Sequence, residues 1–239
     1  MSGVEAVVIA GPGTNRDGDV ADALRLAGAV PRIVLADELV ETRRFLDDAD
    51  LAVVAGGFSY ADSLGAGRML ALDLTLGLGD RLRDFVASGR PVIGICNGFQ
   101  VLTRAGLLPG ALGHNAQGHF ECRWVVLDAP KSNSVWTSGL DAPIHCPIAH
   151  GEGRYVHPDP DSLETAGQVA LRYRSTNPNG SVGDIAGVSD ASGVVLGLMP
   201  HPENHIVARQ HPLHRRGGGG DEHLGLRIFE NGIRHAASL

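Results

Sequence analysis

Short runs of apolar residues alternate with helical patterns through the first half of the chain. Four runs have strand length, namely Glu5–Ala10, Pro31–Leu35, Leu51–Ala55 and Pro91–Ile95. Runs this short and this continuously apolar are typical of strands covered on both faces of a sheet. Helical patterns are predicted over Asp19–Ala27, Thr42–Asp47, the apolar stretch that follows the glycine-rich loop Gly56–Gly67 and ends near Gly89, and Phe99–Ala105. This alternation predicts βαβ units and a mostly parallel sheet.

The second half of the chain has a different pattern. Strands are predicted over Phe120–Leu127, Ile144–Ile148 and Val169–Tyr173, and a hairpin is predicted from Asp184–Val188 and Val194–Leu198 around Asp190–Gly193. These strands are expected either to extend the sheet or to form an antiparallel layer beside it. A flexible loop over Arg215–Gly220 and a closing helix over Glu222–Ala236 complete the pattern. Without an internal repeat or a linker, the sequence predicts one α/β domain over residues 1–239.

Composition limits the kinds of partner to be expected and indicates a cellular compartment. The formal net charge of −7 argues against nucleic acid or an anionic membrane as the main partner. Three widely spaced cysteines do not suggest a disulfide framework, so a reducing, cytoplasmic compartment is expected. The N-terminus does not resemble a signal peptide, and no apolar run approaches the ~18 residues of a membrane span.

One cysteine occupies a turn that is typical of nucleophiles. Cys96 follows an apolar strand, precedes a helix, and has Gly94 and Gly98 two residues to either side. This G-x-C-x-G pattern is the thiol counterpart of the serine elbow of hydrolases, and the helix N-terminus favours the thiolate. A free cysteine is more often a buried structural residue, but the glycines and the strand–turn–helix setting favour a nucleophile. Cys122 and Cys146 lack this setting and are predicted to be buried and structural.

A histidine and a glutamate follow the last predicted strand. His201 lies between Pro200 and Pro202, which restrict the backbone on both sides, and Glu203 can accept a hydrogen bond from one ring nitrogen. A stiff surface loop with a salt-bridged histidine fits this segment equally well when it is taken alone. Together with Cys96, however, the segment favours a general acid–base group and its orienting carboxylate.

The sequence does not predict a metal site or a nucleotide site. Candidate metal ligands form two groups: His119, Cys122, His145, Cys146 and His150, and His205, His211 and His214. Neither group shows the C-x₂-C or H-E-x-x-H spacing that gathers ligands around one ion, so no metal site is predicted. The segment Gly11–Gly18 lacks both the G-x-G-x-x-G and the Gly-Lys-Ser/Thr patterns, so no nucleotide is expected there.

Seven strings, in order along the chain, carry a resemblance to one family. They are GPGTNRD after the first strand, GGFSYAD at Gly56–Asp62, GICNGFQ at Gly94–Gln100, FECRWV at Phe120–Val125, PIAHGEGRY at Pro147–Tyr155, NPNGSVGDIAG at Asn177–Gly187 and GLMPHPE at Gly197–Glu203. With these strings the chain resembles the glutaminase subunits of phosphoribosylformylglycinamidine synthase, which are class I glutamine amidotransferases of purine biosynthesis. The chain departs from the family pattern at Ala61, Ser63, Gly65–Gly67 and His114–His119.

The resemblance implies a fold and a set of site residues. The implied fold is flavodoxin-like and doubly wound, with an added antiparallel element. Cys96, His201 and Glu203 would form the catalytic triad. The backbone N–H groups of Gly57 and Asn97 would bind the oxyanion. Gln100 would help to hold the substrate, glutamine.

The resemblance also implies partners. Ammonia from glutamine would pass to a synthetase subunit, which would use ATP to convert formylglycinamide ribonucleotide to formylglycinamidine ribonucleotide. ATP and Mg²⁺ are expected on that subunit and no cofactor on this chain, and a third small subunit is compatible with the family. Two alternatives remain open: a stand-alone cysteine hydrolase of the same superfamily, and a catalytically inactive regulatory subunit. The surface expected to dock the partner comprises Ser59–Gly67, Asn177–Val182 and the segment after Glu203.

Overall fold

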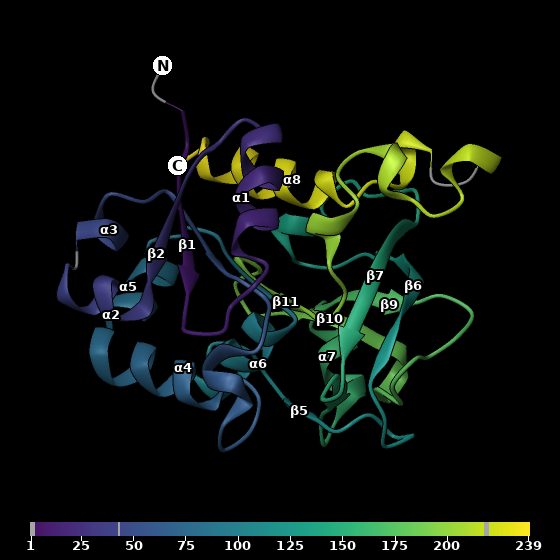
Figure 1. Ribbon diagram of the computed structural model, residues 1–239, viewed down its shortest axis with the longest axis horizontal. Helices are drawn as coiled ribbons and strands as arrows, with labels where there is room; N and C mark the ends of the chain where they lie inside the picture. The colour runs from purple at the N-terminus through teal and green to yellow at the C-terminus, as the bar shows by residue number, and fades with distance from the viewer. Residues whose placement is uncertain (1–2, 43, 218–219) are drawn as a thin grey trace.

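A single mixed sheet runs through the computed structural model, which describes residues 3–42, 44–217 and 220–239 (Figure 1). Its strand order in the described residues is β2-β1-β3-β4-β11-β10-β9-β6-β7. The strands are β1 Glu5–Ala10, β2 Val30–Leu35, β3 Leu51–Val54, β4 Val92–Ile95, β6 Glu121–Asp128, β7 Ile144–His150, β9 Val169–Tyr173, β10 Ile185–Ser189 and β11 Val195–Leu198. A separate antiparallel pair joins β5 Ala111–Gly113 to β8 Arg154–Val156. The predicted second-half strands therefore extend the sheet and do not form a separate layer.

The parallel half of the sheet has the strand order of flavodoxin-like folds. β2, β1, β3, β4 and β11 are parallel neighbours, which corresponds to the order 2-1-3-4-5 with β11 in fifth place. From β11 onward each pair of neighbours is antiparallel. The predicted doubly wound sheet with an added antiparallel element is thus confirmed, as is the predicted hairpin of β10 and β11.

Helices cover both faces of the parallel half. α1 Asp17–Leu26 and α8 Leu226–Ala236 pack together on one face, whereas α4 Arg68–Leu72 and α6 Asn97–Arg104 pack together on the other (Figure 1). Every residue of β3, β4 and β11 is buried, as expected for strands covered on both sides. β2 lies at the sheet edge and is largely exposed, because it has a neighbour on one side only.

Several predicted boundaries are wrong. The predicted helix Thr42–Asp47 is reduced to α3 Arg44–Asp47, with Arg43 outside the described residues, and the short helices α2 Ala36–Glu41 and α7 Pro160–Thr165 were not predicted. The apolar stretch before Gly89 is divided into α4, a π-helical turn over Asp73–Gly77 and α5 Arg81–Ala87, and Gly79 with its φ of +57° precedes α5.

The closing helix starts later than Glu222, where it was predicted to begin. Residues Asp221–His223 form a 3₁₀ turn, and α8 begins at Leu226. Gly225 explains the break, because a Cβ there would lie 2.3 Å from the carbonyl oxygen of Pro202. The chain therefore has to pass close to the backbone that follows His201 before it becomes helical. Within the predicted loop Arg215–Gly220, residues 218–219 lie outside the described part, and Arg215 and Arg216 end a 3₁₀ turn.

Candidate active site

Cys96 lies in a strained turn between β4 and α6. Its φ is +51° and its ψ is −104°, an unusual backbone conformation for a residue with a side chain. The N–H of Cys96 donates to the carbonyl of Leu198 at 2.8 Å and so ties the turn to β11. Both flanking glycines are required: a Cβ at Gly94 would lie 2.5 Å from the Gly98 carbonyl oxygen, and one at Gly98 would lie 2.0 Å from that of Val54. The predicted elbow is therefore present.

His201 and Glu203 reach the same sheet edge because β11 runs parallel to β4, with Leu198 opposite Ile95. His201 Nδ1 is 2.6 Å from Glu203 Oε1, and the two side chains are buried. A Cβ placed on Gly56 would meet His201 Cε1 at 3.0 Å and Cys96 Cβ at 3.5 Å, so His201 and Cys96 both lie against Gly56. The structure thus brings together the three residues of the predicted triad.

The electrostatics of this group favour a protonated imidazole. Burial lowers the pKa of His201. The negative charges of Glu203 and Cys96, and their hydrogen bonds to the ring, raise it by more than burial lowers it, so the pKa lies well above the ordinary 6.5. Among the described residues, Glu203 Oε2 has no hydrogen-bond partner. The hydrogen bond from His201 to Oε1 is therefore the contact that compensates the buried carboxylate. A protonated His201 beside the Cys96 sulfur is equipped to give a proton to a leaving group.

A cavity of about 310 Å³ opens above Cys96. This volume is within the range of small-molecule sites. The cavity is formed by the loop after β3, the start of α6, the loop before β6 and the turn between β7 and β8. Its lining residues are Gly57, Phe58, Asp62, Ala66, Cys96, Gln100, His114, Gly118, His119, Phe120, Ala149, His150, Gly151 and Glu152.

Two backbone N–H groups beside Cys96 are available to an oxyanion. Gly57 lines the cavity with a φ of +145°, and a Cβ there would lie 2.6 Å from the nitrogen of Asn15. Within the described residues, the N–H of Gly57 donates to no acceptor. Asn97 is the first residue of α6, so its N–H has no acceptor within the helix. This arrangement is compatible with the predicted role of both residues.

The side chains of Asn97 and Gln100 form a buried chain of hydrogen bonds. Ser59 Oγ donates to Asn97 Oδ1 at 2.6 Å, Asn97 Nδ2 donates to Gln100 Oε1 at 2.9 Å, and Gln100 Nε2 donates to the carbonyl of Glu152 at 2.6 Å. Both ends of the Gln100 amide are therefore engaged within the protein. Gln100 lines the cavity, where it was predicted to hold glutamine, and it also fixes the wall that carries Glu152.

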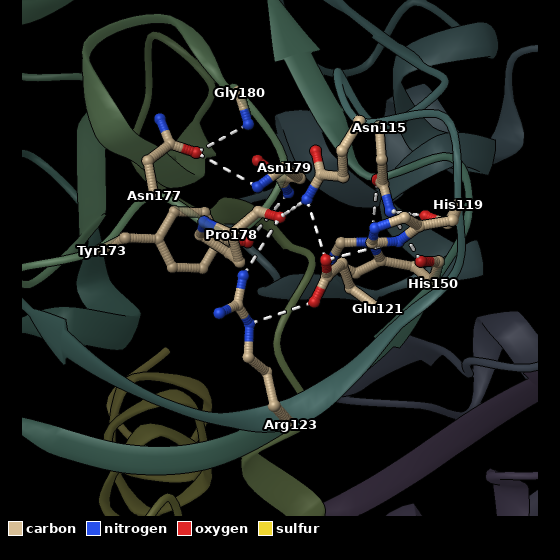
Figure 2. A network of polar contacts seen from close by, with 11 residues as sticks. Asn115, His119, Glu121, Arg123, His150, Tyr173, Asn177, Pro178, Asn179 and Gly180 are labelled. Carbon is tan, nitrogen blue, oxygen red and sulfur yellow. Dashed lines mark hydrogen bonds and ion pairs between the residues drawn. The ribbon is translucent and has the colours of Figure 1, made fainter.

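A polar network holds the turn between β7 and β8, and Asn115 is its centre (Figure 2). Asn115 Nδ2 donates to the carbonyls of His119 and His150 at 3.0 and 2.9 Å. Asn115 Oδ1 accepts from the N–H of Gly153 at 3.0 Å and lies 3.1 Å from His150 Nδ1. The side chain uses all its hydrogen-bonding capacity, and through it the cavity wall from His150 to Gly153 is fixed.

Replacing Asn115 by alanine is expected to destabilise the protein markedly, because it leaves several buried donors and acceptors without partners. Each such group costs roughly 1–3 kcal/mol, so the expected loss is roughly 2–4 kcal/mol in the free energy of unfolding. For a chain of this length that corresponds to a fall of about 4–16 °C in Tm. Thermal unfolding measures it. Asn15→Ala, an exposed site whose side chain makes no hydrogen bond in the described structure, is the matched control. Equal Tm values for the two variants would contradict the role of Asn115.

The loop Asn177–Val182 was expected to dock a partner, but its polar side chains are engaged within the chain. Asn177 Oδ1 accepts from the N–H groups of Asn179, Gly180 and Ser181 (Figure 2). Asn179 is fully buried and donates to the carbonyl of Gly153 at 2.8 Å. These asparagines therefore hold the conformation of the loop. The parts of the loop that remain available to a partner are its backbone and its exposed edge.

The remaining candidate ligands lie apart from the site. His145, His205 and His211 gather with His223 and Trp124 in an aromatic cluster, with ring centroids 4.3–5.5 Å apart. In the part of the chain that the structure describes, no three His, Cys, Asp or Glu side chains are arranged to hold a metal ion.

The two other cysteines differ from each other. Cys146 is buried as predicted, and burial, together with the nearby Glu203, raises the pKa of its thiol well above the ordinary value. Cys122 is exposed on β6, so the burial predicted for it is wrong. Neither residue lines the cavity.

Asp62, His150 and Glu152 line the cavity, and the sequence analysis assigned none of them a role in binding glutamine. Each lies within a string that carried the family resemblance. Their positions in the chain could have indicated this role. Asp62 lies in the loop after β3, His150 is the last residue of β7, and Glu152 lies in the turn between β7 and β8.

A cysteine elbow after the fourth strand of a flavodoxin-like sheet, with a buried histidine–glutamate pair beside it, defines a class I glutamine amidotransferase. Comparison with known proteins agrees, since the family model described as a CobB/CobQ-like glutamine amidotransferase domain matches residues 3–236. Phosphoribosylformylglycinamidine synthase subunit PurQ of Treponema denticola is 46% identical over 86% of this chain and 89% of its own length. That of Dehalococcoides mccartyi is 38% identical over the whole of both chains.

A solved structure extends the comparison to three dimensions. A chain of PurLQS from Thermotoga maritima superposes with a TM-score of 0.80 and 36% identity, over 97% of this chain and 98% of that chain. The chain therefore belongs to the family of PurQ subunits of phosphoribosylformylglycinamidine synthase.

No described helix has the length and apolar character needed to cross a membrane.

Proposed function

We propose that this chain is the glutaminase subunit of phosphoribosylformylglycinamidine synthase and that Cys96, His201 and Glu203 carry its chemistry. The chain supplies ammonia from glutamine for the conversion of formylglycinamide ribonucleotide to formylglycinamidine ribonucleotide in purine biosynthesis. The observation that carries the residue assignment is the buried His201–Glu203 pair beside the strained elbow of Cys96.

The proposed reaction follows from the positions of these groups. The Cys96 sulfur attacks the side-chain amide carbon of glutamine, and the oxyanion accepts hydrogen bonds from the N–H groups of Gly57 and Asn97. The C–N bond breaks as His201 gives its proton to the departing ammonia. Water then attacks the thioester while His201 accepts a proton, which releases glutamate and restores Cys96. The Glu203 carboxylate stabilises the imidazolium.

The partner is part of the same proposal. A synthetase subunit that binds ATP and Mg²⁺ carries out the reaction that consumes the ammonia. We further propose that a third small subunit belongs to the complex and that the complex is cytoplasmic. The chain of PurLQS that this protein resembles supports association with a synthetase subunit. Ammonia released to water is protonated and lost, so a glutaminase of this kind benefits from activation by its acceptor subunit.

A glutaminase assay of the purified chain, with and without the synthetase subunit, its substrate and nucleotide, tests this function. We expect slow turnover by the chain alone and a clear rise in kcat/KM in the mixture, because assembly completes the site. Turnover by the chain alone at the rate of the mixture, with no association by sedimentation, would favour the stand-alone hydrolase. No turnover in either case, with intact synthesis from added ammonia, would favour the inactive regulatory subunit.

A further inference from the structure

Two carboxylates line the cavity that contains Cys96, and they are poorly compensated. Asp62 and Glu152 both belong to its wall, and no Lys or Arg is among the described lining residues. Glu152 has one long contact with a basic group, since His114 Nδ1 lies 3.8 Å from Glu152 Oε1, and the His114 side chain is 84% exposed. Burial, and then the charge of Glu152, raise the pKa of Asp62. A positively charged group bound in the cavity would therefore be stabilised by these two carboxylates.

A buried acceptor lies behind the same wall. His150 lines the cavity, is only 3% exposed, and its Nε2 has no partner among the residues described. Asn115 Oδ1 can only accept, so Nδ1 of His150 donates to it, and Nε2 is left as an acceptor. Burial, and then the positive charge of His201, lower the pKa of His150 to about 4, so that the ring is neutral. The wall thus carries two carboxylates, and no Lys or Arg stands among its described residues to neutralise them.

Both carboxylates are fixed relative to Cys96. Asp62 has a φ of +53°, in a loop whose residue Ser59 donates to Asn97, and Asn97 Nδ2 also lies 3.5 Å from Asp62 Oδ1. The backbone of Glu152 accepts from Gln100 Nε2 at 2.6 Å. Since Asn97 and Gln100 lie on the helix that starts at Cys96, the elbow holds the two acidic residues in a defined place.

The substrate has one positive charge to match this wall. When the side-chain amide of glutamine is at Cys96, its α-ammonium group lies at the other end of the molecule, within the same cavity. We propose that Asp62 and Glu152 bind the α-ammonium group of glutamine and select free glutamine over amides that lack this charge. The inference rests on the proposed glutaminase function and assigns to it two specificity-determining residues.

The test compares two substrates in the assembled enzyme: glutamine and glutaramate, which has the same amide and carboxylate but no α-amino group. Asp62→Asn and Glu152→Gln are expected to raise KM for glutamine roughly 10- to 100-fold with a small change in kcat, since each removes one charge-assisted contact. Hydrolysis of glutaramate should not fall, because this substrate has no ammonium group to lose, so the preference for glutamine falls by at least the same factor. Synthesis from added ammonia should be unaffected.

The exposed carboxylates Asp48 and Glu41 provide the matched controls, as Asp48→Asn and Glu41→Gln, and both variants should keep the wild-type preference. If Asp62→Asn and Glu152→Gln also keep it, or lose kcat equally with both substrates, the ammonium assignment is wrong while the glutaminase function stands. If the wild-type complex fails to hydrolyse glutamine, the proposed function itself fails.

Discussion

Replacing Cys96 by alanine is expected to abolish glutamine-dependent synthesis by the assembled enzyme and to leave ammonia-dependent synthesis intact. The reason is that the sulfur forms the covalent bond to the substrate, and no neighbouring group in the elbow can replace it. The variant is expected to fold, because alanine is smaller and the turn depends on Gly94 and Gly98. The two syntheses are measured side by side in the same preparation.

Cys146→Ala and Cys122→Ala serve as controls for this first prediction. Cys146 is buried beside Glu203 and Cys122 is exposed on β6, so neither reaches the substrate cavity. Both variants should retain glutamine-dependent synthesis, apart from any loss of stability at Cys146. Full glutaminase activity in Cys96→Ala would show that the nucleophile lies elsewhere.

His201→Ala should reduce glutamine-dependent turnover by roughly 10²–10⁴-fold or more, the usual cost of losing general acid–base catalysis. The departing ammonia then leaves without a proton donor, and Glu203 is left as an unpaired buried charge. Glu203→Gln should cost less, because the amide still positions the ring although it no longer stabilises its positive charge. Steady-state kinetics of the assembled enzyme give these factors.

The control for this second prediction is His157→Ala, since His157 lies away from the cavity and from the segments expected to dock the partner. Its rate should equal that of the wild type. A ligand-bound structure with the His201 ring far from the Cys96 sulfur would contradict the acid–base role, as would a His201→Ala variant with unchanged kcat.

The sequence was most informative where the periodicity is simple and the strands are buried. β3, β4 and β11 are short, continuously apolar and covered on both faces, and each was predicted within a residue or two. The short elements β5 and β8 were missed because three residues are too few for a periodic pattern. The start of α8 was misplaced because a close tertiary contact, Gly225 against Pro202, interrupts a segment that is locally helical in composition.

The residues of the site also fall into two groups: those that the sequence alone indicates and those that only the fold brings together. Cys96 and His201 stand within local frames of glycines and prolines, and such frames are visible in a single sequence. The acidic wall depends on Asp62 and Glu152, which are 90 positions apart in the chain and meet only through the fold. The same is true of Asn115, whose importance comes mainly from three buried groups of His150 and Gly153, which lie 35 and 38 positions further along the chain.

Covalent labelling of the assembled enzyme tests the central claim most directly. A diazoketone analogue of glutamine should inactivate glutamine-dependent synthesis and spare ammonia-dependent synthesis, with glutamine itself giving protection. Peptide mass spectrometry should then find one adduct, on Cys96, with Cys122 and Cys146 unmodified. Complete inactivation with Cys96 unmodified, or with the adduct on another residue, would contradict the account.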